Sequence, residues 1–178
     1  MPWSKMKNEQ LLVRPAEKSE LHHIVGYFHG LTPVELTAMG VDSALPPSAK
    51  QWQKNVEKEH ALPAKQQRLF YLLWCTDRGP VGHSNLSHIQ WGKTAKMHLH
   101  LWAPSQRQKG WGKQFVHQCL PLYFERFQLQ ELICEPLASN PGPNRLLPQL
   151  GFDFEKKYRT TPGPINPEQM VNRYRLGR

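Results

Sequence analysis

The chain has 178 residues and a mass of 20.7 kDa, which is the size of a single domain. Hydrophobic residues make up 39% and aromatic residues 10%, so the composition excludes an intrinsically disordered protein. The longest apolar run, Leu69–Cys75, is seven residues long and too short to span a membrane. Residues 1–10 lack the apolar stretch of a signal peptide, so we expect a cytoplasmic protein. We divide it into a tail over 1–8 and one domain over 9–178.

The charge and the cysteines narrow the possible partners. Lys and Arg number 23 against 14 Asp and Glu, a net charge of +9, which favours an anionic partner such as nucleic acid or a phosphorylated cofactor. Nucleic acid is the weaker alternative, because the sequence has no zinc-finger spacing, RNA-binding aromatic motif or basic run. Cys75, Cys119 and Cys134 form no C-x-x-C pair, so we expect neither a metal site nor a disulfide scaffold.

The first third of the chain predicts one strand and two helices. A short strand over 11–14 ends at Pro15, and an amphipathic helix follows, with apolar residues at the i, i+3, i+4 and i+7 positions from Leu21 to Phe28. Residues 32–45 predict a loop with a helical turn. Ser48 is a candidate cap for a second helix over 49–59.

The rest of the chain alternates strands and helices. Strands are predicted over 68–75, 81–91, 96–102, 132–134, 152–158 and 170–176, and helices over 115–127 and 140–150. In the strand over 96–102, His98, His100 and Trp102 share one face. The order predicts an α/β domain with a mixed central sheet of about seven strands and helices on both faces.

The most informative segment is the loop over 99–112, with the sequence LHLWAPSQRQKGWG, between a strand and a helix. The first amides of a helix have no partners within it, and the helix dipole is positive at that end. Gly110 and Gly112 allow a phosphate to approach the backbone, and the loop and the first helical residues add the cations Arg107, Lys109 and Lys113. The segment therefore predicts an anion site, although it is neither a P-loop nor a Rossmann fingerprint.

Two motifs resemble those of the GNAT N-acetyltransferases. The first is R-x-x-G-x-G at Arg107–Gly112, and the second is Asn140 followed by Leu146-Leu147 and the LGF at 150–152. The second motif is most similar to the branch that acetylates ribosomal-protein N-termini and related amines. The resemblance implies a GNAT fold, with strands 4 and 5 splayed and acetyl-CoA as the cofactor. It implies cofactor contacts from Trp102, Ala103, Arg107, Gln108, Lys109, Gly110, Trp111, Gly112, Lys113, Asn140 and, more weakly, Asn144.

The expected activity is transfer of an acetyl group from acetyl-CoA to a primary amine, on a small molecule or a protein N-terminus, by direct attack in a ternary complex. The family's two usual acids are missing, since Leu147 and Pro143 occupy their positions. His100 and Glu135 are the candidate bases. The resemblance places the acceptor between residues 27–52 and 160–169, and the protein is expected to be a monomer or a homodimer. The alternative is a CoA-binding module with little or no catalytic activity.

Overall fold

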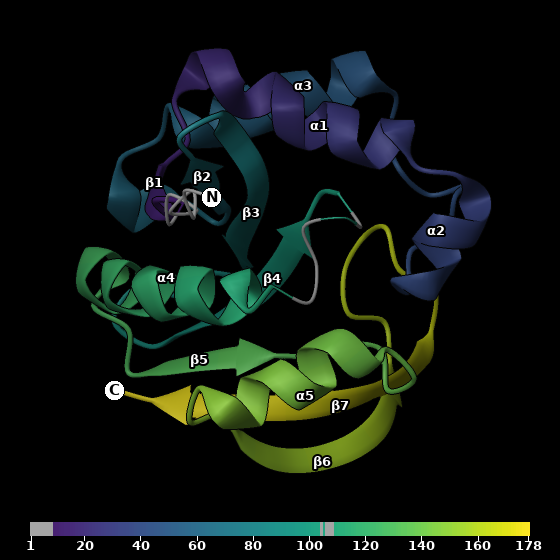
Figure 1. Ribbon diagram of the computed structural model, residues 1–178, viewed down its shortest axis with the longest axis vertical. Helices are drawn as coiled ribbons and strands as arrows, with labels where there is room; N and C mark the ends of the chain where they lie inside the picture. The colour runs from purple at the N-terminus through teal and green to yellow at the C-terminus, as the bar shows by residue number, and fades with distance from the viewer. Residues whose placement is uncertain (1–8, 104, 106–108) are drawn as a thin grey trace, which may run out of the picture.

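A computed structural model describes residues 9–103, 105 and 109–178. Its centre is a seven-stranded sheet with the order β1-β2-β3-β4-β5-β7-β6 (Figure 1). The β4–β5 pair is parallel and the other neighbours are antiparallel, which confirms the predicted mixed sheet. The strands are β1 Leu12–Pro15, β2 Phe70–Thr76, β3 Gly79–Ser87, β4 Thr94–Leu101, β5 Glu131–Cys134, β6 Asp153–Thr160 and β7 Gln169–Gly177.

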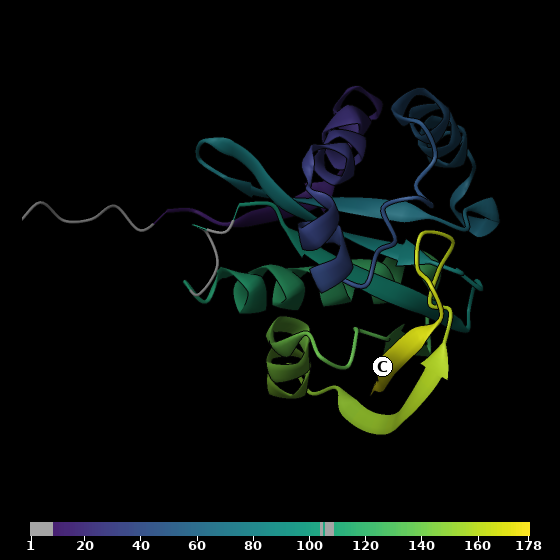
Figure 2. The same cartoon turned by 90° about the vertical axis from the view of Figure 1, so that its right-hand side faces the viewer.

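Helices cover both faces of the sheet, as the sequence predicted. Figure 2 shows α1 and α3 on one side of the sheet and α4 on the other. We call these sides the α1 face and the α4 face. The helices are α1 Leu21–Gly30, α2 Pro33–Ala38, α3 Ala49–His60, α4 Trp111–Phe127 and α5 Pro141–Gln149, with 3-10 turns at Lys18–Glu20 and Ala64–Gln66.

The short helix α2 differs from the sequence prediction, which placed a loop with a helical turn there and only two helices before β2. Thr32 and Glu35 form a capping box, in which each side chain bonds to the backbone N–H of the other. Pro33 occupies the first turn, where a missing N–H costs nothing. These local features and the burial of Leu36 stabilise a helix that apolar periodicity alone does not reveal. The predicted cap of α3 is confirmed, because Ser48 accepts a hydrogen bond from the Gln51 N–H.

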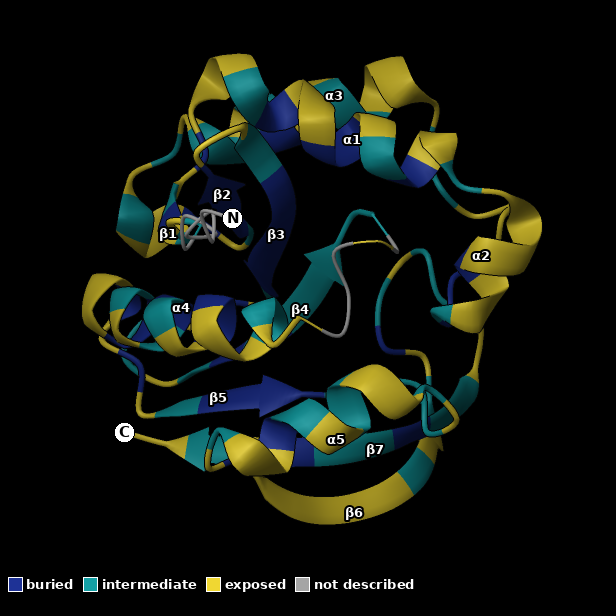
Figure 3. Cartoon of the chain, viewed as in Figure 1, coloured by how far each residue is buried: buried dark blue, intermediate teal, exposed yellow. Residues whose placement is uncertain are grey.

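The apolar core has two parts, one on each face of the sheet, and β2 contributes to both. Every residue of β2 is buried (Figure 3). Leu72 and Trp74 pack toward α4, and Tyr71 and Leu73 pack toward α1 and α3. On the α4 face the ring of Trp74 stacks on Phe115, with 5.1 Å between centroids. This contact anchors α4 and therefore fixes where its N-terminus lies.

We expect Phe115→Ala to destabilise the fold by about 3–5 kcal/mol, because the side chain is fully buried and its removal leaves a cavity against Trp74. Urea unfolding followed by tryptophan fluorescence measures the change. Val34→Ala is the control, since Val34 is 79% exposed and its truncation should leave the midpoint unchanged. A Phe115→Ala midpoint equal to that of the wild type would contradict this account of the core.

Candidate active site

The strands β4 and β5 pair over a short length and then diverge. Their register covers three residue pairs, from Thr94 with Glu131 to Lys96 with Ile133. Beyond it β4 runs on to Leu101 while β5 ends at Cys134 (Figure 1). Where the pairing stops, the Cys134 thiol donates a hydrogen bond to the Met97 carbonyl, with 3.2 Å between Sγ and O. Among the described residues, the backbone of β4 beyond Met97 therefore has no strand partner on the β5 side and is open to a ligand.

Residue parity decides which backbone groups of β4 face this divergence. The Trp102 N–H donates to the Val81 carbonyl at 2.9 Å and so points toward β3. Successive residues of an extended chain point their backbone groups to opposite sides, so Leu101 and Ala103 point toward the divergence. The Trp102 N–H is therefore used within the sheet, which argues against the predicted cofactor contact of the Trp102 backbone. Instead, Trp102 contributes its indole, which donates from Nε1 to Nδ1 of His83 at 2.8 Å.

The N-terminus of α4 has the features of an anion site. Gly110 precedes the helix with φ 72°, and no side chain caps the first turn. That turn carries no acidic residue, so the helix dipole is uncompensated by protein carboxylates there. Lys109 lies over the ring of Trp111, with 4.7 Å from Nζ to the centroid. Two predicted contacts in this loop, Arg107 and Gln108, lie outside the described residues.

The two asparagines of the second motif have different surroundings. The side-chain oxygen of Asn140 accepts from the Gly142 N–H at 3.3 Å and caps α5. The Asn144 amide nitrogen donates to the carbonyls of Leu137 and Asn140, and its oxygen accepts from Asn172 at 2.7 Å and from the Tyr174 hydroxyl at 3.1 Å. Asn144 is thus fully used in holding α5 against β7. This arrangement argues against Asn144 as a cofactor ligand.

The helices α4 and α5 approach each other at the N-terminal turn of α4. A Cβ added to Gly112 would lie 3.7 Å from a methyl group of Leu146. Leu147 is fully buried in the core, so this expected position of an acid offers none here. The structure therefore brings the two sequence motifs together without supplying the missing hydroxyl.

On the α1 face, the two segments predicted to bind the acceptor meet. The Asp42 N–H donates to the Ile165 carbonyl at 3.0 Å, and the Asn166 side chain donates to the Gly40 carbonyl at 2.7 Å. The connection from α2 to α3 is therefore fastened to the connection from β6 to β7. Together they enclose one side of the region beside β4.

His100 also lies on the α1 face, within a cluster of rings. It stacks on His83 with 4.7 Å between centroids and contacts Phe28 and Tyr27 at 5.0 and 5.7 Å. Burial, together with the neighbouring histidines, lowers the pKa of the fully buried His83 well below its usual value, so His83 is neutral. The sequence analysis did not single out His83. Only the pairing of β3 with β4 places it opposite His100.

The other predicted base, Glu135, is the centre of an ion-pair network. Its carboxylate accepts from Lys96 at 2.7 Å, from Arg173 at 2.6 Å and from the Tyr158 hydroxyl, and only 2% of the side chain is exposed. Burial alone would raise the pKa of this carboxyl, but the three donors outweigh burial and lower it. A carboxylate with this pKa and three donors is a poor proton acceptor. The geometry argues against Glu135 as the base and favours a structural role.

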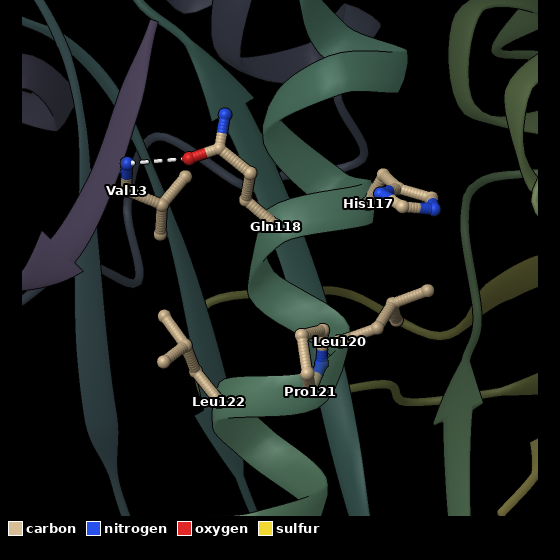
Figure 4. A pocket seen from close by; sticks show the side chains of 6 residues that line it. All are labelled: Val13, His117, Gln118, Leu120, Pro121 and Leu122. Carbon is tan, nitrogen blue, oxygen red and sulfur yellow. Dashed lines mark hydrogen bonds between the residues drawn. The ribbon is translucent and has the colours of Figure 1, made fainter.

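The remaining features of the structure concern metal binding, the membrane and a hollow beside α4. Among the described residues no group of three or more His, Cys, Asp or Glu side chains could hold a metal ion, and no helix is long and apolar enough to cross a membrane. A hollow beside α4 is lined by Val13, His117, Gln118, Leu120, Pro121 and Leu122 (Figure 4). It contains no acid and lies away from the α1 face, so we do not assign it to the active site.

Comparison with known proteins identifies the family. Residues 10–153 match the family described as Acetyltransferase (GNAT) domain, and the chain therefore belongs to it. It is an acetyl-CoA-dependent N-acetyltransferase, which transfers an acetyl group from acetyl-CoA to an amine. No curated protein matches the sequence.

Solved structures show the same fold at low sequence identity. A spermidine N-acetyltransferase from Vibrio cholerae, in complex with CoA and spermine, is 18% identical, with a TM-score of 0.75 over 94% of this chain and 95% of that chain. RimL, a ribosomal L7/L12 α-N-protein acetyltransferase bound to coenzyme A through a cysteine disulfide, is 16% identical, with a TM-score of 0.75 over 94% of this chain and 93% of that chain. The predicted GNAT fold is confirmed.

We expect Glu135→Gln to destabilise the protein at neutral pH by about 2–3 kcal/mol, because it removes a charge that three buried or half-buried donors share. The folded pKa of Glu135 is lowered, so its stabilisation is present above the unfolded value of about 4.3 and is lost as the pH falls below it. Urea unfolding between pH 7 and pH 3 measures both effects.

The variant should lose less stability on acidification than the wild type. Glu168→Gln is the matched control, because its ion pair with Arg159 is 3.9 Å long and exposed on both sides. Equal stability of Glu135→Gln and the control at pH 7 would show that the network contributes nothing to the fold.

Proposed function

We propose that the divergence of β4 and β5 holds the pantetheine arm of acetyl-CoA. The observation that carries the proposal is the juxtaposition of two features: β4 backbone beyond Lys96 that β5 does not pair, and the α4 N-terminus that follows it. Ala103, with Leu101, would bond the arm as an added strand does. Trp102 would border it with its indole. Asn140, at the start of α5, would contact the arm from the other side.

The anionic part of the cofactor would lie at the start of α4. Backbone N–H groups of the first turn, a helix dipole and nearby cations favour a pyrophosphate there. The residues that we assign to this role are Lys109, Gly110, Trp111, Gly112 and Lys113, together with Arg107 and Gln108 of the same loop. The absence of an acidic residue in the first turn of α4 supports the assignment.

The acceptor would approach the thioester from the α1 face, in a ternary complex. The walls would be α1 and the two fastened connections, and the floor would be the histidine side of β4. The nitrogen of the acceptor attacks the thioester carbon, and the enzyme has to remove a proton from it. His100, which the sequence predicted as the base, lies on this side of the strand, whereas the donors around Glu135 argue against that residue.

The acceptor would be a primary amine, on a small molecule or a protein N-terminus. The two neighbours named above are a spermidine acetyltransferase and a protein α-N-acetyltransferase, which represent these two kinds of acceptor. We further propose that residues 9–178 form a single domain, that the protein is a monomer or a homodimer, and that it is cytoplasmic. Three buried free cysteines agree with a reducing compartment.

The second candidate function is a CoA-binding module with little catalysis. The observation that favours it is the absence of a hydroxyl at both usual acid positions, where Leu147 is buried in the core and Pro143 has no donor. A protein that binds acetyl-CoA and acetylates no amine in a broad panel would fit this alternative.

We expect Gly110→Asp to weaken the binding of acetyl-CoA measured by calorimetric titration. The new carboxylate would repel the pyrophosphate at the position where the helix dipole should attract it. Binding should fall at least tenfold, and Gly112→Asp should act in the same direction. The wild-type protein should bind in the micromolar range.

Gly92→Asp is the matched control. Gly92 and Gly110 both have φ 72° and neither has a neighbour within 4 Å of an added Cβ, so both variants carry the same backbone strain. Gly92 lies between β3 and β4, where the proposal places no cofactor. Equal loss of binding in both variants, or undiminished binding by Gly110→Asp, would refute the proposed pyrophosphate site.

A further inference from the structure

Three polar side chains form a hydrogen-bonded chain between the α1 face and solvent. His98 Nε2 lies 2.9 Å from the Ser87 hydroxyl, and that hydroxyl lies 3.0 Å from His88 Nδ1. His98 is half-buried on β4, whereas His88 is exposed. A serine hydroxyl donates one hydrogen bond and accepts others, so it can pass a proton between two imidazoles.

The fold holds this chain in place. Ser87 ends β3 and pairs with Lys96, so its side chain points to the same face of the sheet as His98, two residues further along β4. His88 follows with φ 51°, a left-handed conformation that few residues other than glycine adopt. This conformation turns the His88 ring back to the serine. Such outliers persist where the surrounding structure fixes them, and they are common at functional sites.

The position of His98 along β4 fits the reacting end of the cofactor. In the proposed function the pyrophosphate lies beyond Ala103 and the arm runs back along β4. Five residues of strand span about 16 Å, which brings an extended arm from Ala103 to the level of His98. The pairing with β5 resumes at Lys96 and closes the path there. The thioester would therefore lie beside His98.

The second ring nitrogen of His98 is open to an acceptor. The hydrogen bond to Ser87 uses Nε2, and Nδ1 has no partner among the described residues. Two buried side-chain atoms of the described residues lack a hydrogen-bond partner, Gln53 Oε1 and His83 Nε2, and neither belongs to His98. His98 itself is half-buried, and its hydrogen bond to Ser87 leaves Nδ1 for a proton from a substrate.

We propose that His98 accepts the proton of the attacking amine and that Ser87 and His88 pass a proton on to solvent, an inference that rests on the proposed function. The amine nitrogen bonds to the thioester carbon, the carbon–sulfur bond breaks, and coenzyme A leaves as the thiolate with the electron pair of that bond. The amine proton moves to His98 Nδ1. The Nε2 proton moves to Ser87, the serine proton moves to His88 Nδ1, and His88 Nε2 releases one to water. One proton enters and one leaves, and exchange with solvent restores the tautomers.

The charges around His98 suit this role. Burial, followed by Lys96 on β4 and by His88, lowers its pKa to about 4, against the opposite effect of Glu135. His83 and His100 lie on the same face of the β3–β4 pair as His98, and the side chains of Arg173 and Tyr158 bond to Glu135. His98 is therefore neutral at pH 7, and the same low pKa makes it a weak base. A protonated His98 would return its proton readily, so a path that removes it favours turnover.

The test compares steady-state acetyl transfer by the wild type and by His98→Ala, Ser87→Ala, His88→Asn and His100→Ala across a panel of amines. His98→Ala should lower kcat about 100-fold or more with little change in the KM for acetyl-CoA, and added imidazole should restore part of the rate. Ser87→Ala and His88→Asn should lower kcat less, and their rates should rise with buffer concentration. Asparagine tolerates the left-handed backbone of His88 and carries no imidazole.

His117→Ala is the control, because His117 is exposed on α4, away from the α1 face (Figure 4). Thermal unfolding confirms that each variant is folded. If the wild type transfers acetyl groups and His98→Ala is as active, or if only His100→Ala abolishes transfer, the relay is overturned and the proposed function stands. Loss of activity in His98→Ala without imidazole rescue, and without buffer dependence in Ser87→Ala, also overturns it. Cofactor binding without transfer to any amine overturns the proposed function and the relay together.

Discussion

The short parallel pairing of β4 with β5 is the constraint on which the rest of the site depends. After three residue pairs the strands part, and β4 continues without a neighbour on that side. A continuous sheet would satisfy these backbone groups internally, and no ligand could add to it. Because the sheet opens there, the helices that follow β4 and β5 both begin at the opening. Two sequence motifs that are about 30 residues apart thus lie at the same opening of the sheet.

A sheet that parts in the middle needs another connection between its halves. The carboxylate of Glu135 provides one, since its donors come from β4, β6 and β7 while it follows β5 directly. Lys96 lies at the last paired position of β4, so the network begins where the backbone ladder ends. One carboxylate shared by two cations and a hydroxyl fixes the spacing of the strands through directional bonds. Its burial and its three donors argue against the catalytic role that the sequence suggested for Glu135.

The α1 face carries two separate groups of histidines with different chemistry. His83 and His100 lie among aromatic rings, and the His83–Trp102 hydrogen bond orients the indole beside the divergence. His98 and His88 are instead joined through a hydroxyl and lead outward. In the first group burial keeps a histidine neutral and packed. In the second group, the hydrogen-bonded path leads from a half-buried histidine to an exposed one, as proton transfer to solvent requires.

The sequence by itself determined the family and the order of the strands and most helices, and it predicted an anion site at the start of α4. Each of these is local: apolar periodicity, glycines before a helix, and capping residues act within a few positions. The sequence also placed His98, His100 and Trp102 on one face, because alternation along a strand is local too. Where α2 forms, the sequence predicted only a loop with a helical turn, because this helix is stabilised by a capping box rather than by apolar periodicity.

Only the tertiary structure decided what those residues meet. The register of β3 with β4 brings Ser87 beside His98, which is 11 positions away, and the return of β7 brings Arg173 to Glu135, 38 positions away. The hydrogen bond between Trp102 and Val81 directs the backbone N–H of Trp102 toward β3, away from the side on which the cofactor contact was expected. These outcomes depend on which strands pair and in what register. Pairing is set by the packing of the whole core, which no short stretch of sequence contains.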